Sequence, residues 1–150
     1  MWTEVGLDDE VLLQRCLDIM KAMSSRYERV TIEETVRPWL KVEGGKAYYY
    51  KQGILEIVMV LLFSPKRSQF RLTTVGFLNG APNQVFDLLR LELKSLLAQA
   101  GTNTCFAMVP LQWDYPPMAQ LVQLAPTLPG TVITVEHLSE DRAEWHVVFE

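Results

Sequence analysis

The sequence predicts an α/β domain of the α+β type, built on a mixed central sheet of about seven strands with four helices. Two observations predict it. Short apolar or alternating segments, typical of strands, are interspersed with longer segments whose apolar residues follow helical spacing. Their order is strand, helix, helix, three strands, helix, strand, helix and two strands. A chain of 150 residues suits one domain, so we expect residues 1–150 to fold as a single unit.

Composition narrows the functional classes. Hydrophobic residues make up 49% of the chain and charged residues 21%, a balance typical of soluble globular proteins. The net charge is -4 with both signs interspersed, and no basic stripe points to nucleic acid. The longest apolar run, residues 57–63, is too short to cross a membrane, and the first residues have no signal-peptide pattern. We therefore expect a cytoplasmic protein that binds neither nucleic acid nor membrane.

The two cysteines, Cys16 and Cys105, both lie in apolar runs, which predicts buried, reduced thiols. The sequence has no Cys-x-x-Cys motif and no cluster of Cys and His, so we expect no metal site.

The first third of the chain predicts a strand at residues 3–5 and two helices. Asp8 and Asp9 suit the start of the first helix, because a carboxylate there accepts hydrogen bonds from free backbone N–H groups. Residues 31–34 have the pattern of a capping box, which predicts that the second helix begins there. Pro38 should kink or end that helix, because proline lacks the N–H group.

The middle of the chain predicts three strands, at residues 47–50, 54–63 and 69–78. The strand at 54–63 is apolar on both faces, as expected for a strand covered on both sides. In the first strand, alternation sends Tyr48 and Tyr50 to one face and Tyr49 to the other. These tyrosines either pack within the sheet or form an aromatic wall for a ligand or partner.

The remaining elements complete the predicted order. A long amphipathic helix follows the turn at residues 79–83 and ends at Gly101. The next strand, residues 104–109, should lie parallel to the strand at 69–78 through a right-handed crossover. A short helix at 117–124 precedes a terminal hairpin, which is formed by strands at 131–137 and 143–149.

This order and spacing resemble the GNAT superfamily of N-acyltransferases over essentially the whole chain. The resemblance implies that acetyl-CoA or another acyl-CoA binds where two neighbouring parallel strands, here residues 71–78 and 104–109, splay apart. Strand backbone would hold the pantetheine arm, and the turn before the long helix would bind the pyrophosphate. The cofactor-binding residues so implied are Thr73, Thr74, Val75, Phe77, Gly80, Ala81 and Asn83.

The chain departs from the family pattern in that turn. The family carries Gln/Arg-x-x-Gly-x-Gly/Ala, whereas residues 78–84 contain one glycine, no arginine and a proline that removes one N–H donor. The stretch is therefore either a degenerate phosphate site or an ordinary turn before a helix.

The resemblance also implies a tyrosine that protonates the departing thiolate. Aligning the family pattern on Ala119 places Gln123 at that position, and glutamine cannot supply the proton. Tyr115 is the tyrosine that could substitute. The alternative is that Tyr115 and Trp113 cap the edge of the core.

Two carboxylates are candidates for the general base that accepts a proton from the acceptor amine, namely Glu56 and Asp114. If Glu56 pointed into a cleft, desolvation would raise its pKa to a useful value. The alternative places Glu56 at the exposed start of its strand. His137 and His146 fall on the terminal hairpin, where alternation predicts that His146 is solvated.

Two functions remain open from the sequence. One is an acyl-CoA-dependent N-acyltransferase that transfers an acetyl or acyl group to an amine on a small molecule or protein. Its acceptor would enter between the loops at residues 24–30 and 139–142. The other is a GNAT-like module, of the kind found among phage-encoded proteins, that has lost catalysis and forms a homodimer or binds a partner protein.

Overall fold

A seven-stranded mixed sheet forms the centre of the protein in a computed structural model that describes residues 1–23, 27–64, 69–110, 131–139 and 142–149. The strands are β1 (Trp2–Glu4), β2 (Lys46–Gln52), β3 (Leu55–Ser64), β4 (Gln69–Leu78), β5 (Thr104–Pro110), β6 (Thr131–Ser139) and β7 (Arg142–Phe149). The helices are α1 (Glu10–Met23), α2 (Val36–Lys41) and α3 (Pro82–Gln99). The helix predicted at residues 117–124 lies outside the described residues.

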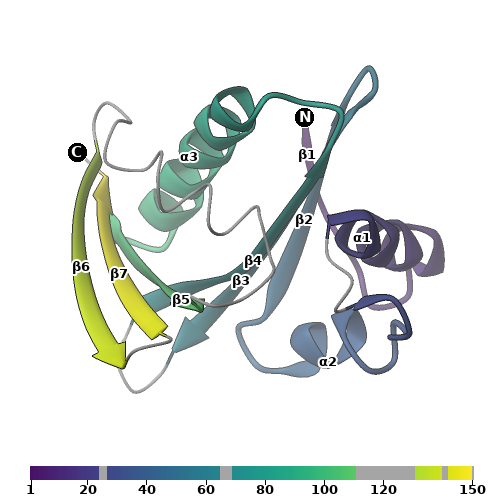
Figure 1. The fold of residues 1–150 in the computed structure, drawn as a ribbon, viewed down its shortest axis with the longest axis horizontal. Helices are drawn as coiled ribbons and strands as arrows, with labels where there is room; N and C mark the ends of the chain where they lie inside the picture. Colours follow the sequence, from purple (N-terminus) through teal and green to yellow (C-terminus); the bar gives the residue numbers. More distant parts are fainter. Residues whose placement is uncertain (24–26, 65–68, 111–130, 140–141, 150) are drawn as a thin grey trace.

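The strand order is β1-β2-β3-β4-β5-β7-β6. Neighbouring strands are antiparallel except β4 and β5, which are parallel. This confirms the mixed sheet and the predicted parallel pair. Because α3 connects β4 to β5, it covers one face of the sheet, whereas α1 and α2 lie on the opposite side (Figure 1).

The core fills both faces of the sheet. Residues Ile57 to Val60 of β3 are fully buried, which confirms that this strand is covered on both sides. The apolar positions of α1 and α3 face inward as their spacing predicted. Their buried side chains are Leu13, Cys16, Leu17, Ile19 and Met20 on α1, and Val85, Phe86, Leu89, Leu93 and Leu97 on α3.

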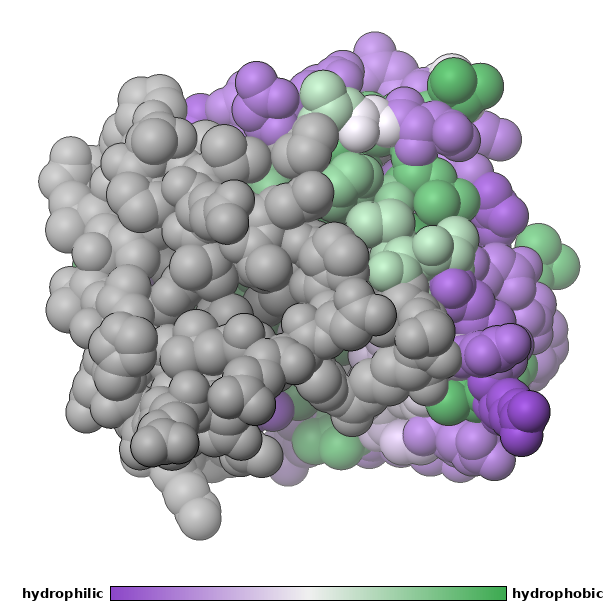
Figure 2. All heavy atoms as spheres, in the orientation of Figure 1, coloured by the Kyte–Doolittle hydropathy of each residue, from purple (hydrophilic) through white to green (hydrophobic). Residues whose placement is uncertain are grey.

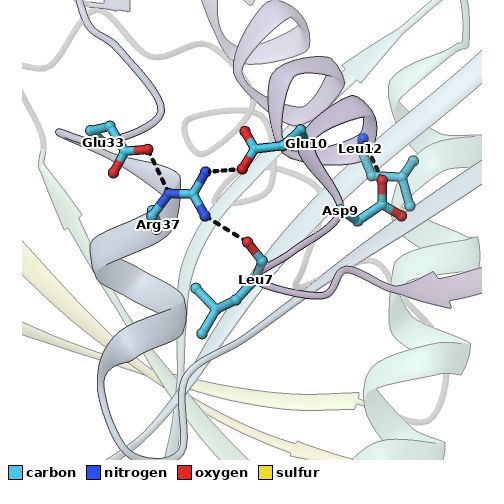
Figure 3. Close-up of polar contacts among 6 residues, drawn as sticks. All are labelled: Leu7, Asp9, Glu10, Leu12, Glu33 and Arg37. Carbon is cyan, nitrogen blue, oxygen red and sulfur yellow. Dashed lines mark hydrogen bonds and ion pairs between the residues drawn. The ribbon is translucent and has the colours of Figure 1, made fainter.

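Acidic side chains hold the beginning of α1. The backbone N–H of Leu12 donates a hydrogen bond of 3.1 Å to the Asp9 carboxylate, which confirms the expected cap. Figure 3 shows this contact beside a second one, in which the Arg37 guanidinium reaches across from α2.

The second helix begins later than the sequence predicted. Only half of the capping box forms, with the Thr31 N–H donating to the Glu34 carboxylate at 3.5 Å, and the helix starts at Val36 after a turn. Pro38 does not end it, because the helix continues to Lys41. Pro38 is its third residue, where a backbone N–H would have no intrahelical acceptor, so proline costs little.

Arg37 fastens α2 to the start of α1 (Figure 3). Its guanidinium donates to the Leu7 carbonyl at 2.6 Å, to the Glu10 carboxylate at 2.6 Å and to the Glu33 carboxylate at 2.7 Å. The three acceptors come from two segments that are distant in sequence. Arg37 therefore fixes residues 31–39 against the rest of the fold, and part of this segment lines the pocket described next.

Candidate acyl-CoA cleft and neighbouring pocket

Strands β4 and β5 stay together for only two residue pairs. Phe70 pairs with Cys105 and Arg71 pairs with Phe106, after which no pairing is recorded although both strands are described to their ends. The edge of β4 from Leu72 to Leu78 therefore has no strand partner in β5. Such an edge presents backbone N–H and C=O groups that can bind an extended ligand.

A β-bulge marks the point where the two strands part. On β3, Val60 lies opposite Thr74 and Leu61 lies opposite Leu72, so Thr73 is an extra residue on β4. A bulge bends its strand and increases the local twist, which turns β4 away from β5. Residues 72–75 contain no glycine or proline, so the sequence carried no signal for this bulge.

The bulge opens beside a pocket of about 430 Å³. Thr73 and Thr74 line it from β4, and the other lining residues come from the chain between α1 and α2 and from α2 itself. These are Tyr27, Val30, Glu34, Thr35 and Trp39. The Thr73 Oγ1 atom is buried and has no hydrogen-bond partner among the described residues. A buried hydroxyl without a partner costs about 1–3 kcal/mol, so this atom favours a ligand that would satisfy it.

The other predicted cofactor residues of β4 point to the opposite face. Val75 is fully buried, and the Phe77 ring contacts the Phe86 ring of α3 at a centroid distance of 6.0 Å. Their side chains therefore serve the core, and only their backbone groups can serve a ligand at the open edge.

The turn before α3 combines an unusual backbone with close packing. Asn79 has a φ of 60°, and its side-chain amide donates to the Ile54 carbonyl at 3.1 Å. A Cβ on Gly80 would lie 2.4 Å from Leu55 Cδ1, so any larger residue here would require the buried Leu55 side chain to shift. Ala81 supplies no side-chain cap to α3. The N–H groups of Asn83 and Gln84, in the exposed first turn after Pro82, have no intrahelical acceptor.

Glu56 is buried and fully engaged. It is 7% exposed, in contrast to the expectation of an exposed strand start. Arg15 binds both of its carboxylate oxygens, with an Nε contact of 2.6 Å, and the Tyr49 hydroxyl donates to it at 2.5 Å. The hydrogen bond from Arg15 lowers the pKa of Glu56 to about 2. A general base would need the opposite change, a pKa raised above the usual value. Burial of the Tyr49 hydroxyl, together with its hydrogen bond to the Glu56 carboxylate, raises the pKa of Tyr49 to about 12.

Glu56 also lies apart from the threonine pocket. It lines a separate groove of about 670 Å³ between α1 and the ends of β2 and β3, and the two share no lining residue. Figure 2 shows that the side of the molecule over α1 and α2 is mostly hydrophilic. The role of Glu56 as a base stays a prediction, and this geometry favours a structural one. Asp114 and Tyr115 lie outside the described residues.

The other groups that the sequence singled out are packed into the structure. Both Cys16 and Cys105 are free and buried, and burial raises the pKa of each thiol to about 12. The ring of His146 stacks on that of Phe106 at 6.4 Å and is partly buried, so the prediction of a solvated side chain was wrong. Tyr49 and Tyr50 make contacts on opposite faces of β2, and the Tyr50 ring packs on Trp2.

A cluster of metal ligands and a membrane-spanning helix are both absent from the described part of the chain. No group of three or more His, Cys, Asp or Glu side chains there is arranged to hold a metal ion. None of its helices combines the length and the apolar character that crossing a membrane requires.

Several solved structures that superpose on this chain over nearly its full length are acetyltransferases. An aminoglycoside 6'-acetyltransferase type Ii superposes with a TM-score of 0.70 at 16% identity, covering 99% of this chain and 96% of that one. An aminoglycoside 6'-N-acetyltransferase complexed with coenzyme A gives 0.68 at 13% identity, with 98% and 94% covered. A spermidine N-acetyltransferase chimera, from Vibrio cholerae and hSSAT, gives 0.59 at 9% identity, with 99% and 96% covered.

Sequence comparison matches no family model and no curated protein. The likeness is therefore one of structure, and it extends over nearly the full length of the chain. The order of the strands, the parting of β4 from β5 and these superpositions together show that the chain has the fold of the GNAT acetyltransferases.

Proposed function

We propose that this protein is an acyl-CoA-dependent N-acyltransferase that acts on an amine. The observation that carries the proposal is the unpaired edge of β4 beside the splayed β5. The pantetheine arm of an acyl-CoA is an extended chain with two amides, so it can pair with this edge as a strand would. The thioester would then lie near the bulge, next to the pocket at Thr73 and Thr74.

The reaction in this proposal is an ordinary aminolysis of a thioester. The acceptor loses one proton as its ammonium becomes a free amine, and its nitrogen then attacks the thioester carbonyl. A C–N bond forms, the C–S bond breaks, and the second proton released by nitrogen balances the one taken up by the thiolate. In the proposal Tyr115 supplies the proton to the thiolate, and Asp114 or water accepts the proton from the amine.

The first turn of α3 is the proposed site for the pyrophosphate. The N–H groups of Asn83 and Gln84 and the positive end of the helix dipole suit an anion. The turn has fewer donors than the family signature provides, so we expect weaker binding than in proteins that carry it.

Calorimetric titration with acetyl-CoA tests the proposal, with desulfo-CoA to show that the nucleotide and pantetheine suffice. Asn83→Glu places a negative charge where the pyrophosphate should bind, and Asn83→Gln is the neutral control. Because a carboxylate in a first helical turn is favourable, the Glu variant should fold at least as stably as the parent. We expect it to bind acetyl-CoA about tenfold more weakly than the Gln variant.

The packing of Gly80 against Leu55 favours a second candidate, a GNAT-like module without catalysis, because it gives the turn a structural reason for its glycine. Absence of any heat or thermal shift at millimolar acetyl-CoA would establish this candidate over acyl transfer. Equal binding by the Glu and Gln variants would remove the pyrophosphate from α3 but leave the cleft on β4 in place.

A further inference from the structure

The described lining of the pocket at Thr73 carries less negative charge than a bound polycation would require. Of the described residues that line it, Glu34 is the only charged one. The others are two aromatic residues, one valine and three threonines. Each ammonium group taken from water needs a compensating partner, so a second and third positive charge would lie against aromatic and apolar surface at a cost.

From these observations we propose that the pocket binds a small primary amine with a single positive charge and an apolar body, as the acceptor of the proposed transfer. This inference rests on the proposed function for the reaction, although not for the binding. Glu34 binds the ammonium group, and Trp39 and Val30 pack on the apolar body. Thr73, on the bulge where β4 parts from β5, turns its unpartnered hydroxyl to the acceptor nitrogen.

The position of each residue supports its role. Glu34 is exposed, and among the described residues its carboxylate accepts a weak 3.5 Å hydrogen bond from the Thr31 N–H, so it retains acceptor capacity. Trp39 is half-buried on α2 and can present the apolar face of its indole to an alkyl or aryl group. A volume of about 430 Å³ lies within the range of small-molecule sites.

Two sets of contacts hold the two sides of the pocket in place. The pairing of β4 with β3 sets the bulge, and Arg37 fastens the segment that carries Glu34 and Trp39 to α1. The backbone positions of Glu34 and Thr73 are therefore set by the fold, which gives the pocket a basis for selecting its ligand.

The test compares three ligands by calorimetry with the full chain, in the absence of CoA. Phenethylamine has one charge and an apolar body, 2-phenylethanol is its neutral analogue, and spermidine is a polycation. We expect phenethylamine to bind at least about fivefold more tightly than either of the others, because a hydrogen-bonded charge adds that much or more. With acetyl-CoA present, phenethylamine should also be acetylated with a higher kcat/KM than spermidine.

Substitutions at Glu34 and Thr73 test whether these residues bind the amine. Glu34→Gln should weaken the binding of phenethylamine about fivefold and leave the binding of 2-phenylethanol unchanged. Glu43→Gln, an equal charge change outside the pocket lining, should leave the binding of both ligands unchanged. Thr73→Val keeps the shape and removes the unpartnered hydroxyl, so it should fold as stably as the parent but lower kcat/KM for phenethylamine about tenfold.

Preference for spermidine, or equal binding of phenethylamine and 2-phenylethanol, overturns the inference and leaves acyl transfer standing. If phenethylamine binds selectively through Glu34 but acetyl-CoA does not bind at all, the pocket is confirmed as an amine site and the proposed function fails instead.

Discussion

Replacing Glu56 by glutamine should change how the stability of the protein depends on pH. In the folded protein the pKa of Glu56 is lowered from 4.5 to about 2, chiefly by the hydrogen bonds from Arg15. A difference of about 2.5 pKa units corresponds to about 3 kcal/mol of stability at neutral pH. The Arg15 side chain is 41% exposed, so water screens the pair and we expect about half of that value.

The sign of the effect follows from the lowered pKa. The unfolded chain binds a proton at Glu56 near pH 4.5, whereas the folded chain does so only near pH 2. The stabilisation is therefore fully present above about pH 5.5 and is lost as the pH falls towards 2. Between pH 7 and pH 3 the parent should lose about 1 kcal/mol of unfolding free energy through this group alone.

Urea unfolding at pH 7, 5, 4 and 3 measures this loss. Glu56→Gln cannot titrate, so its unfolding free energy should decline less between pH 7 and pH 3, by about 1 kcal/mol. Glu28→Gln, on the exposed surface, is the matched control and should keep the slope of the parent. Identical pH slopes for the parent and Glu56→Gln would show that the pair with Arg15 does not hold the carboxylate ionised.

Two further predictions concern packing. Gly80→Ala should lower the unfolding free energy by about 1–3 kcal/mol, because its Cβ would lie 2.4 Å from Leu55 Cδ1; the double variant with Leu55→Ala should be no less stable than Leu55→Ala alone, and additive losses in urea unfolding would contradict the contact. The native protein should not react with Ellman's reagent at pH 7.5, because burial raises the pKa of Cys16 and Cys105 to about 12, whereas the urea-unfolded chain should release two equivalents of thionitrobenzoate. Rapid reaction of the folded protein would place a thiol at the surface.

The position of Glu56 shows where inference from the sequence ends. A carboxylate within an apolar strand indicates an unusual environment for that group, and Glu56 is buried. Whether its pKa rises or falls depends on a partner 41 positions away, on the face of α1 that packs over the sheet. No spacing within β3 indicates that Arg15 will lie there.

The bulge at Thr73 is a second case. Alternation in residues 69–78 predicted the strand with its observed ends, yet the extra residue is visible only in the register against β3. It lies where β4 leaves β5, and it brings Thr73 and Thr74 to one pocket together with residues from the α1–α2 connection. Glu34 and Trp39 were therefore missed as candidate residues, although both lie in a segment that the sequence identified as a helix start.

The sequence by itself determined the order and type of the described elements, because periodicity, turn residues and end caps act within a few positions of the chain. It also determined that α3 would connect two parallel strands, since a crossover of that length allows little else. The tertiary structure alone decided the parting of β4 and β5, the pocket that joins Thr73 to Glu34 and the hydrogen bonding of Glu56. These features depend on contacts between residues far apart in sequence, whose geometry is set only when the helices pack on the sheet.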